Sequence, residues 1–357
     1  MAVLRVVIDQ AKDVVDPDQA DAARGLLHGL GATAPQRCTI EAIVPAGAES
    51  EPPAGADTLR RLALGRRELG AAWQLGVVAG VGGGMIHAPS LFAPLTKHDK
   101  VNDYDQTVAT VWDLRPWTAP EQLPRAGVLW QRAMMKRAVK YADAVVVPTH
   151  EMAERLGGLV KLRDRIRVIP GAVAPGFAIP HDASERRVAL GAPARYLVAT
   201  GRAETLEPVF AAAVAADADA FVLDAADDAA PSIAERAVAA GLDAPRVHVL
   251  SRRDAEDRAA LLGGALGFVA SDPAPAWPWR LVEALALGVP VIARNGGVHA
   301  DVLADGGLLV EPDGYAEAVQ QAAGEGARRL SVLAADRSRA YSWEGAAERV
   351  WALHADL

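Results

Sequence analysis

Side chains that bind metal ions or act as nucleophiles are sparse in this sequence. Its eight histidines are scattered along 357 residues without an H-E-x-x-H pair, and its one cysteine, Cys38, has no second cysteine to pair with. The sequence therefore predicts no metal cofactor and no internal disulfide.

A glycine-rich segment, Gly80–Gly84, precedes the short run that ends at His87. It has neither the G-x-G-x-x-G spacing of dinucleotide-binding loops nor the G-x-x-x-x-G-K spacing of a P-loop. We interpret it as a turn, with phosphate binding as the alternative.

One carboxylate stands inside an apolar stretch. Glu283 lies in Leu281–Ala293, which reads LVEALALGVPVIA. Its neighbours are of types that are usually buried, which favours a held carboxylate over one that merely faces solvent.

The elements that must position these residues follow from the apolar pattern. Runs of four to six apolar residues without strict alternation are typical of strands buried on both faces, as in a parallel sheet covered by helices. Amphipathic segments between them predict helices, and their alternation predicts doubly wound α/β structure. Predicted helices include Ala56–Leu75, Val128–Tyr141, Trp279–Leu287 and Tyr315–Ala334, and the segment Gly171–Gly191 is interpreted as a linker.

Composition excludes several classes of protein. The chain is 51% hydrophobic and 23% charged, as globular proteins are, and its net charge of −8 argues against nucleic-acid binding. No stretch approaches the roughly 20 apolar residues of a bilayer span, and the first residues do not resemble a signal peptide. We expect a cytoplasmic protein, and the abundance of alanine and arginine suggests a bacterial source.

Two stretches carry a family resemblance. The first contains His87-Ala88-Pro89, Val108–Leu114 (VATVWDL) and Ile166–Val173 (IRVIPGAV). The second contains the block around Glu283, Leu308–Pro312 (LLVEP) and, further on, Ser342-Trp343. In order and spacing these segments resemble the retaining glycosyltransferases of GT-B fold, usually numbered family four.

The resemblance implies a fold of two facing Rossmann-like, doubly wound α/β domains with a C-terminal helix that crosses back to the first. We place the acceptor-side domain at 1–178, the nucleotide-sugar-side domain at 192–335 and the crossover helix at 336–357.

The resemblance also implies a donor site in the second domain. Glu283 would accept hydrogen bonds from ribose hydroxyls, and Arg202 would neutralise the diphosphate at the start of the helix near Trp279. The chain departs from the family at two places: Pro275 stands where a first glutamate is expected, and no lysine follows Arg202. Arg280 is interpreted as the replacement cation, with an ordinary surface arginine as the alternative. The remaining predicted donor residues are Gly201, Leu250, Trp279, Leu281 and Gly296, the last of which fits a simple turn equally well.

The first domain would bind the acceptor through His87 and Trp112, with Asp113 as a catalytic residue that contacts an acceptor hydroxyl. A packed histidine and an aspartate that caps a turn are the alternatives for His87 and Asp113.

The predicted activity is transfer of a hexose, with retention, from a nucleoside diphosphate sugar to a cell-envelope glycan or lipid-linked acceptor. The alternative is a degenerate transferase fold kept as a binding or scaffold subunit. Arginines and lysines on two predicted helices would rest on anionic lipid, or simply form a solvated face: Arg60, Arg61, Arg66 and Arg67, and Arg132, Lys136, Arg137 and Lys140.

Overall fold

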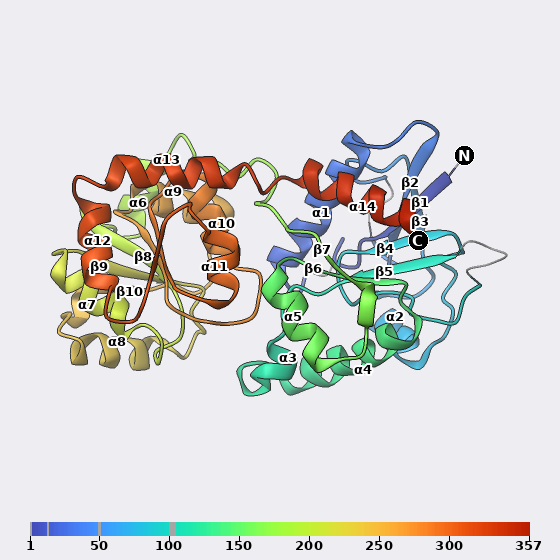
Figure 1. Cartoon of the computed structure of the whole chain (residues 1–357), viewed down its shortest axis with the longest axis horizontal. Helices are drawn as coiled ribbons and strands as arrows, with labels where there is room; N and C mark the ends of the chain where they lie inside the picture. Colours follow the sequence, from blue (N-terminus) through green and yellow to red (C-terminus); the bar gives the residue numbers. More distant parts are fainter. Residues whose placement is uncertain (1, 13, 49–50, 100–104) are drawn as a thin grey trace. The chain divides into compact units, whose positions relative to one another are not determined.

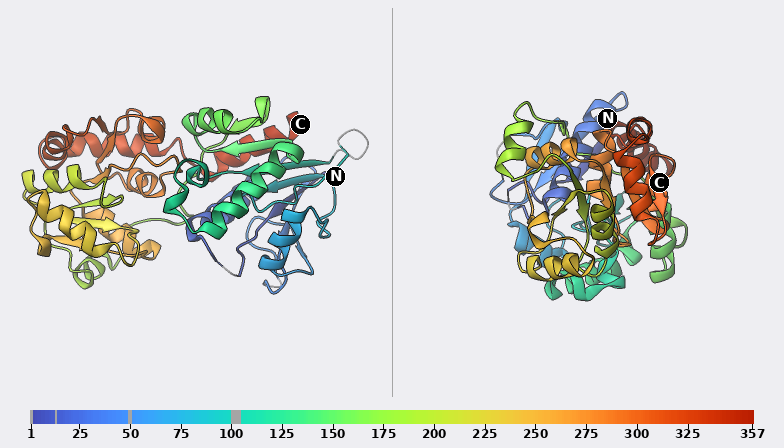
Figure 2. Two further views of the ribbon diagram at one scale, coloured as in Figure 1. Left: turned by 90° about the horizontal axis from the view of Figure 1, so that it is seen from below. Right: turned by 90° about the vertical axis from the view of Figure 1, so that its left-hand side faces the viewer.

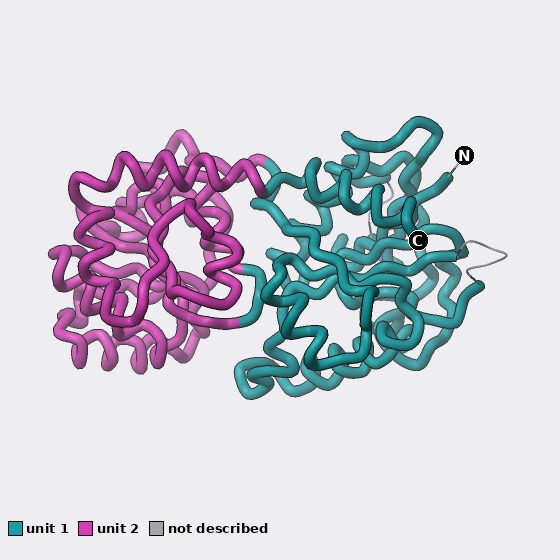
Figure 3. The backbone as a smooth tube through the Cα atoms, in the orientation of Figure 1, with its two compact units in different colours: residues 1–175, 275–277, 341–357 teal, residues 176–274, 278–340 magenta. Residues whose placement is uncertain are grey.

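The computed structural model describes residues 2–12, 14–48, 51–99 and 105–357. They form two compact units (Figure 3). Unit 1 comprises residues 1–175, 275–277 and 341–357, and unit 2 comprises 176–274 and 278–340. The chain therefore passes between the units after residues 175, 274, 277 and 340.

Unit 1 is built on a seven-stranded parallel sheet in the order β3-β2-β1-β4-β5-β6-β7 (Figure 1). Its central strands are apolar and buried on both faces, as the four buried residues of β6 illustrate. The strands are β1 (Ala2–Val7), β2 (Cys38–Val44), β3 (Thr58–Arg61), β4 (Met85–Ala88), β5 (Gln106–Thr110), β6 (Ala144–Val147) and β7 (Ile166–Val168). The helices are α1 (Pro17–Ala32), α2 (Arg66–Leu75), α3 (Arg115–Thr118), α4 (Arg125–Tyr141), α5 (His150–Leu159) and α14 (Trp343–Asp356).

The last helix, α14, packs against α1 at the opposite end of the sequence. The Trp343 indole donates to the Val173 carbonyl at 2.7 Å, and the Trp351 indole donates to the Leu30 carbonyl at 3.3 Å. Gly25 and Gly29 let α14 approach, because a Cβ on Gly29 would lie 2.4 Å from the Trp343 carbonyl oxygen.

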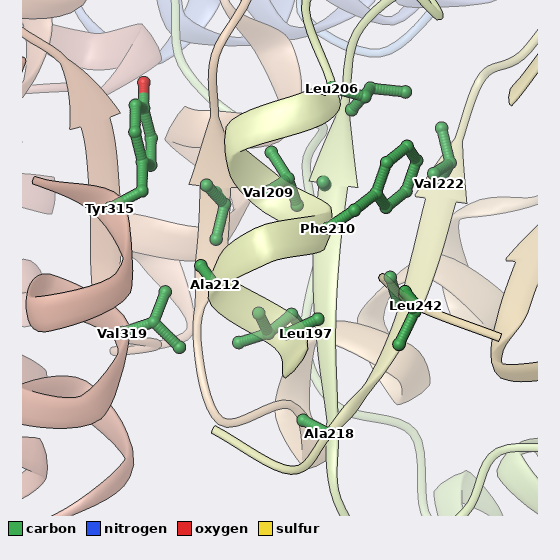
Figure 4. Packing of buried hydrophobic residues seen from close by; sticks show 14 of the residues in the cluster. Leu197, Leu206, Val209, Phe210, Ala212, Ala218, Val222, Leu242, Tyr315 and Val319 are labelled. Atoms are coloured by element: carbon green, nitrogen blue, oxygen red, sulfur yellow. The ribbon is translucent and has the colours of Figure 1, made fainter. Parts of the chain in front are cut away.

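Unit 2 holds a six-stranded parallel sheet in the order β10-β9-β8-β11-β12-β13, with helices on both faces (Figures 1 and 2). Phe210 of α7 packs toward Val222 of β9, and Val319 of α12 closes the same core (Figure 4). The strands are β8 (Tyr196–Thr200), β9 (Asp219–Leu223), β10 (Val247–Val249), β11 (Phe268–Ala270), β12 (Val291–Arg294) and β13 (Leu308–Val310). The helices are α6 (Ala183–Ala189), α7 (Glu207–Ala215), α8 (Ala230–Ala239), α9 (Ala255–Gly264), α10 (Trp279–Ala286), α11 (Gly297–Leu303), α12 (Tyr315–Ala323) and α13 (Ala327–Ser338).

Three local predictions were wrong. The predicted helix Ala56–Leu75 is strand β3 followed by α2, so Arg60 and Arg61 lie on an edge strand. The predicted linker contains α6, which packs on α9. The predicted helix Tyr315–Ala334 is divided into α12 and α13 around Gly324 and Gly326, because glycine weakens a helix interior.

No helix among the described residues is long and apolar enough to cross a lipid bilayer.

Candidate active site

The loops after the parallel strands of unit 2 gather polar residues at one edge of the sheet. Arg202 follows β8, Asp224 follows β9 and Asp272 lies two residues after β11. Leu250 follows β10, and Gly296 follows β12 by two residues. The carboxyl edge of an open parallel sheet is where such folds bind ligands.

A buried charge network lies behind this edge. Glu283 of α10 is 4% exposed, as are its partners Arg258 of α9 and Arg280 of α10. Arg258 donates from Nη2 and Nε to the Glu283 carboxylate at 2.7 and 3.2 Å, and Arg280 Nη1 donates to Glu283 Oε1. Arg280 Nε also donates to Asp224 Oδ2 at 2.7 Å. Two buried cations are thus balanced by two carboxylates, as buried charges require.

These contacts define what Glu283 and Arg280 do here. Neither is a solvent-exposed side chain, so the alternatives of a solvated glutamate and a surface arginine do not describe this structure. Three of the roughly four hydrogen bonds that a carboxylate accepts are occupied on Glu283 by arginine donors. Arg280 already forms ion pairs with two carboxylates. That it also binds a phosphate group stays a prediction.

Arg202 is an accessible cation of this edge, where Arg294, the last residue of β12, is exposed as well. Its side chain is 45% exposed, with Nε bonded to Asp272 Oδ2 at 3.2 Å and Nη1 3.6 Å from Glu204. Pro278, the residue before α10, provides no side-chain capping hydrogen bond to the first turn of the helix. Amides of an uncapped first turn attract anions. Arg202 and the first turn of α10 therefore provide a cation and a helix N-terminus for binding an anion.

The other predicted donor residues have plain structural roles as well. Gly201 precedes Arg202 in the turn after β8, and Leu281 is buried in α10. Gly296 precedes α11 with φ of 106°, a backbone region that glycine adopts readily. This agrees with the simple turn considered for Gly296.

A cavity of about 550 Å³ opens in unit 1 at the carboxyl edge of its sheet. Aromatic, amide and charged side chains line it, including predicted residues Trp112 and Asp113. A volume of this size suits a small ligand of a few rings. The further lining residues are Asp9, Gln10, Val15, Asp16, Gln19, Arg66, Arg67, Gly70, Ala71, Gln74, Ser90, Leu91, Phe92, Thr110, Val111, Pro124, Gly127, Trp130 and Gln131.

Asp9 and Arg66 form the charged floor of this cavity. Asp9 is 5% exposed, and Arg66 donates to its Oδ2 from Nε at 3.0 Å and from Nη2 at 2.8 Å. Burial raises the pKa of the Asp9 carboxyl, while Arg66 opposes that shift. The Arg66 guanidinium also lies 5.2 Å from the centroid of the Phe92 ring.

The aromatic wall comes from α4 and from the segment after β4. The rings of Phe92 and Trp130 lie 6.0 Å apart at an interplanar angle of 30°. The Trp112 indole donates to the Pro89 carbonyl at 2.7 Å, which fixes its ring. Aromatic faces beside amide and carboxylate groups suit a ligand with both C–H faces and hydroxyls.

Asp113 and His87 differ in accessibility. Asp113 Oδ1 accepts from the Arg115 amide at 2.7 Å and its carboxylate pairs with the Arg115 guanidinium, which is the turn-capping role considered above. His87 is 1% exposed, outside the cavity lining, with its ring centroid 5.6 Å from that of His354. Burial holds the pKa of His87 well below its usual value, which agrees with a packed, neutral histidine.

The segment Pro275–Trp277 belongs to unit 1 and attaches directly beside Trp112 and Asp113. The Leu114 amide donates to the Pro275 carbonyl at 2.9 Å, and the Trp277 amide donates to the Trp112 carbonyl at 2.8 Å. These two bonds frame an antiparallel bridge between Asp113 and Ala276. Trp277 is 2% exposed, so the residues at the expected glutamate position serve unit 1 as a structural strap.

Sequence reasoning missed several residues of both sites. Asp9 and Gln10 come two and three residues after the end of β1, and polar residues after an apolar run are a usable signal for a sheet-edge site. Arg258 carried a weaker signal, an arginine among the apolar residues of α9. Arg66, Phe92 and Trp130 come from separate segments and had no local signature.

Among the described residues, no group of three or more histidine, cysteine, aspartate or glutamate side chains is arranged to hold a metal ion.

Comparison with known proteins finds a family match within the chain. Residues 195–325 match the family described as "Glycosyl transferases group 1". Over this segment the chain is similar to the group 1 glycosyl transferases. Apart from 275–277, the matched region lies in unit 2, and it includes Glu283, Arg258 and Arg280. The predicted resemblance to group 1 glycosyl transferases and the transferase class are confirmed, whereas family four and retention of configuration stay predictions.

Solved structures show that the fold extends over the whole chain. Sucrose-phosphate synthase from Thermosynechococcus elongatus is 20% identical with a TM-score of 0.66, over 100% of this chain and 99% of that one. Anabaena HepE in complex with UDP and glucose is 15% identical with a TM-score of 0.65, over 100% of both chains. WaaG, a glycosyltransferase involved in lipopolysaccharide biosynthesis, is 15% identical with a TM-score of 0.61, over 98% of each.

At these identities the likeness establishes the fold, and the predicted two-domain GT-B architecture is confirmed. No curated protein sequence matches this chain.

Proposed function

We propose that this glycosyl transferase moves a hexose from a nucleoside diphosphate sugar to a hydroxyl of a glycan or lipid-linked acceptor of the cell envelope, with retention of configuration. Unit 2 holds the nucleotide sugar and unit 1 holds the acceptor. The observation that carries the proposal is the family match over the region that contains the Arg202 edge and the Glu283 network.

The donor half rests on charge. A diphosphate needs cations and amide donors, and Arg202 with the first turn of α10 supplies both. Glu283 keeps about one free acceptor position, enough for a ribose hydroxyl. HepE, whose structure holds UDP and glucose, supports a uridine nucleotide as the first donor to test.

The acceptor half rests on the cavity of unit 1. Its aromatic wall and polar floor match the two faces of a sugar ring. WaaG, which acts in lipopolysaccharide biosynthesis, supports a cell-envelope acceptor.

The chemistry then needs stabilisation of the departing diphosphate. Arg202 and helix amides would stabilise its growing charge, with Arg280 as the second predicted cation. The diphosphate would take the acceptor proton on the same face of the sugar, so that configuration is retained. Asp113 would orient the acceptor hydroxyl.

Calorimetry with UDP tests the donor site. Arg202→Ala should weaken UDP binding by about ten-fold or more, because a charge-assisted hydrogen bond contributes about 1.5–3 kcal/mol. The matched control is Arg339→Ala, an arginine of unit 2 whose side chain is 80% exposed. Equal UDP affinity for both variants, or no binding by UDP, GDP or ADP, would contradict the proposal.

A second candidate is a scaffold subunit without transfer activity. It is favoured by Pro275, which gives its carbonyl to unit 1, and by the arginines already bound to Glu283. It predicts intact UDP-glucose after prolonged incubation and a protein partner recovered on affinity capture. Sugar release by the native chain that is lost in Arg202→Ala would reject it.

A further inference from the structure

The carboxyl edge of the unit 2 sheet carries an aspartate whose side chain reaches solvent. Asp224 directly follows Leu223, the last residue of β9, and its side chain is 29% exposed. Its backbone lies in the left-handed region with φ of 56°, which aspartate adopts more readily than most residues do. Strands β8 and β9 pair with Thr200 opposite Leu223, so Arg202 and Asp224 leave neighbouring strands at the same edge.

One guanidinium joins Asp224 to the buried Glu283. Arg280 donates from Nε to Asp224 Oδ2 at 2.7 Å and from Nη1 to Glu283 Oε1. Arg280 is the second residue of α10, so this link lies in the first turn of the helix, where the proposed diphosphate would bind. Because Arg280 and Arg258 balance the two carboxylates, the network as a whole has no net charge with which to repel that anion.

The two carboxylates differ in how many hydrogen bonds they can still accept. Arginine donors occupy three of the roughly four acceptor positions on Glu283, whose side chain is 5% exposed. Among the described residues, Arg280 alone donates to the Asp224 carboxylate, and it does so at Oδ2. Asp224 Oδ1 is therefore the carboxylate oxygen of this network that is most able to accept a hydrogen bond from a ligand.

A ribose presents two neighbouring hydroxyls, and Glu283 has room for about one of them. We propose that Asp224 accepts a hydrogen bond from the other ribose hydroxyl of the bound nucleotide. Arg280 and Arg258 then act as positioning residues that hold the two carboxylates in place. The inference rests on the proposed function, and it names the side chain by which the donor site distinguishes ribose from deoxyribose.

Calorimetry with UDP, 2′-deoxy-UDP and 3′-deoxy-UDP tests this contact. The native chain should bind each deoxy nucleotide about ten-fold or more weakly than UDP, because each lacks a hydroxyl that donates to a charged group. Asp224→Gly should bind UDP about ten-fold more weakly than the native chain does, and should lose the preference for UDP over at least one deoxy nucleotide. Glycine adopts the left-handed backbone of this position readily, so the change removes the carboxylate without backbone strain.

Two further variants serve as a second test and a control. Asp224→Asn keeps an oxygen for Arg280 but has no negative charge, so its preference for UDP should lie between those of the native chain and Asp224→Gly. It carries the test if thermal melting shows that Asp224→Gly is unfolded. The matched control is Asp227→Asn, an exposed aspartate of the same loop, which should bind all three nucleotides like the native chain.

Three results would overturn the inference. The first is a native chain that binds UDP and both deoxy nucleotides equally. The second is a loss of affinity in the Asp224 variants that is equal for all three nucleotides, which would mean that Asp224 only supports the fold. Either result leaves the proposed function intact, whereas a native chain that binds none of UDP, GDP and ADP would reject the proposed function and this inference together. If GDP or ADP is the nucleotide that binds, its deoxy forms replace those of UDP.

Discussion

At the scale of single residues, it was easier to predict that a side chain is buried than to predict which residues it contacts. The apolar neighbours of Glu283 indicated a held carboxylate, and it is 4% exposed. Its main partner, Arg258, comes from another helix 25 residues earlier, and no local pattern joins the two. Likewise Trp112 and Asp113 were chosen from a motif, whereas Asp9, Arg66 and Trp130 share their cavity only because the chain folds. The sequence indicates which types of residue form a site. It does not indicate which residues contact one another, because those contacts join segments that are far apart in the chain.

The buried histidine pair of unit 1 predicts a pH dependence of stability. Burial lowers the pKa of His354 to about 4 and that of His87 in the same direction, while an unfolded histidine titrates near 6.5. Between pH 6.5 and pH 4 these histidines are protonated in the unfolded chain but neutral in the folded chain. The folded state therefore loses stability as pH falls from 6.5 toward 4. For His354 the loss is roughly 3 kcal/mol.

Chemical denaturation at pH 7 and at pH 5 measures this effect. His354→Leu should flatten the decline relative to the native chain, and His181→Gln, an exposed histidine, should leave it unchanged. A decline equally steep in His354→Leu would show that His354 is not its source.

At the scale of elements, the buried strands and the longer amphipathic helices were the predictable part. Strand β6 and helix α10 follow the apolar pattern closely. Strand β3 was missed because an edge strand with two arginines lacks the buried run that identifies its neighbours. Helix α6 was missed because only Ala183 of its seven residues is buried, so its sequence has almost no apolar face.

The contact between α1 and α14 predicts the effect of one methyl group. Gly29→Ala would place a Cβ 2.4 Å from the Trp343 carbonyl oxygen, and backbone cannot yield as a flexible side chain can. We expect a loss of about 1–3 kcal/mol in the free energy of unfolding, typical of overpacking. Gly158→Ala in α5 meets no atom within 4 Å and should stabilise the chain by about 0.5–1 kcal/mol. Thermal melting of the two variants should move in opposite directions; a shared direction would reject the close approach.

At the scale of the whole molecule, two α/β units were predictable from the alternation of strands and helices. The sequence placed the main change of unit within the segment 171–191, and the structure changes unit after residue 175. The return of 275–277 to unit 1 had no signal, because three residues have no periodicity. Their place is decided by backbone hydrogen bonds to Trp112 and Leu114, which any residue with a free amide or carbonyl can make.

Removing α14 should affect the two units unequally. A chain that ends at residue 340 loses the helix that covers α1, including buried Trp343 and Trp351. Hydrogen exchange should show α1 and β2 losing protection while α7 and β8 keep theirs, since the latter pack within unit 2. Equal loss in both units would mean that they unfold as one cooperative body.

The strap Pro275–Trp277 has a consequence for engineering hybrid enzymes. A chimera that takes unit 2 from a relative by exchanging 176–340 in one piece also brings a foreign tripeptide into unit 1 of the host. The graft must therefore retain the native tripeptide, so that its indole still fills the space beside Trp112 and Gly171. Unit 2 of this protein is transplantable only as two fragments, 176–274 and 278–340, joined on either side of a tripeptide that stays in the host.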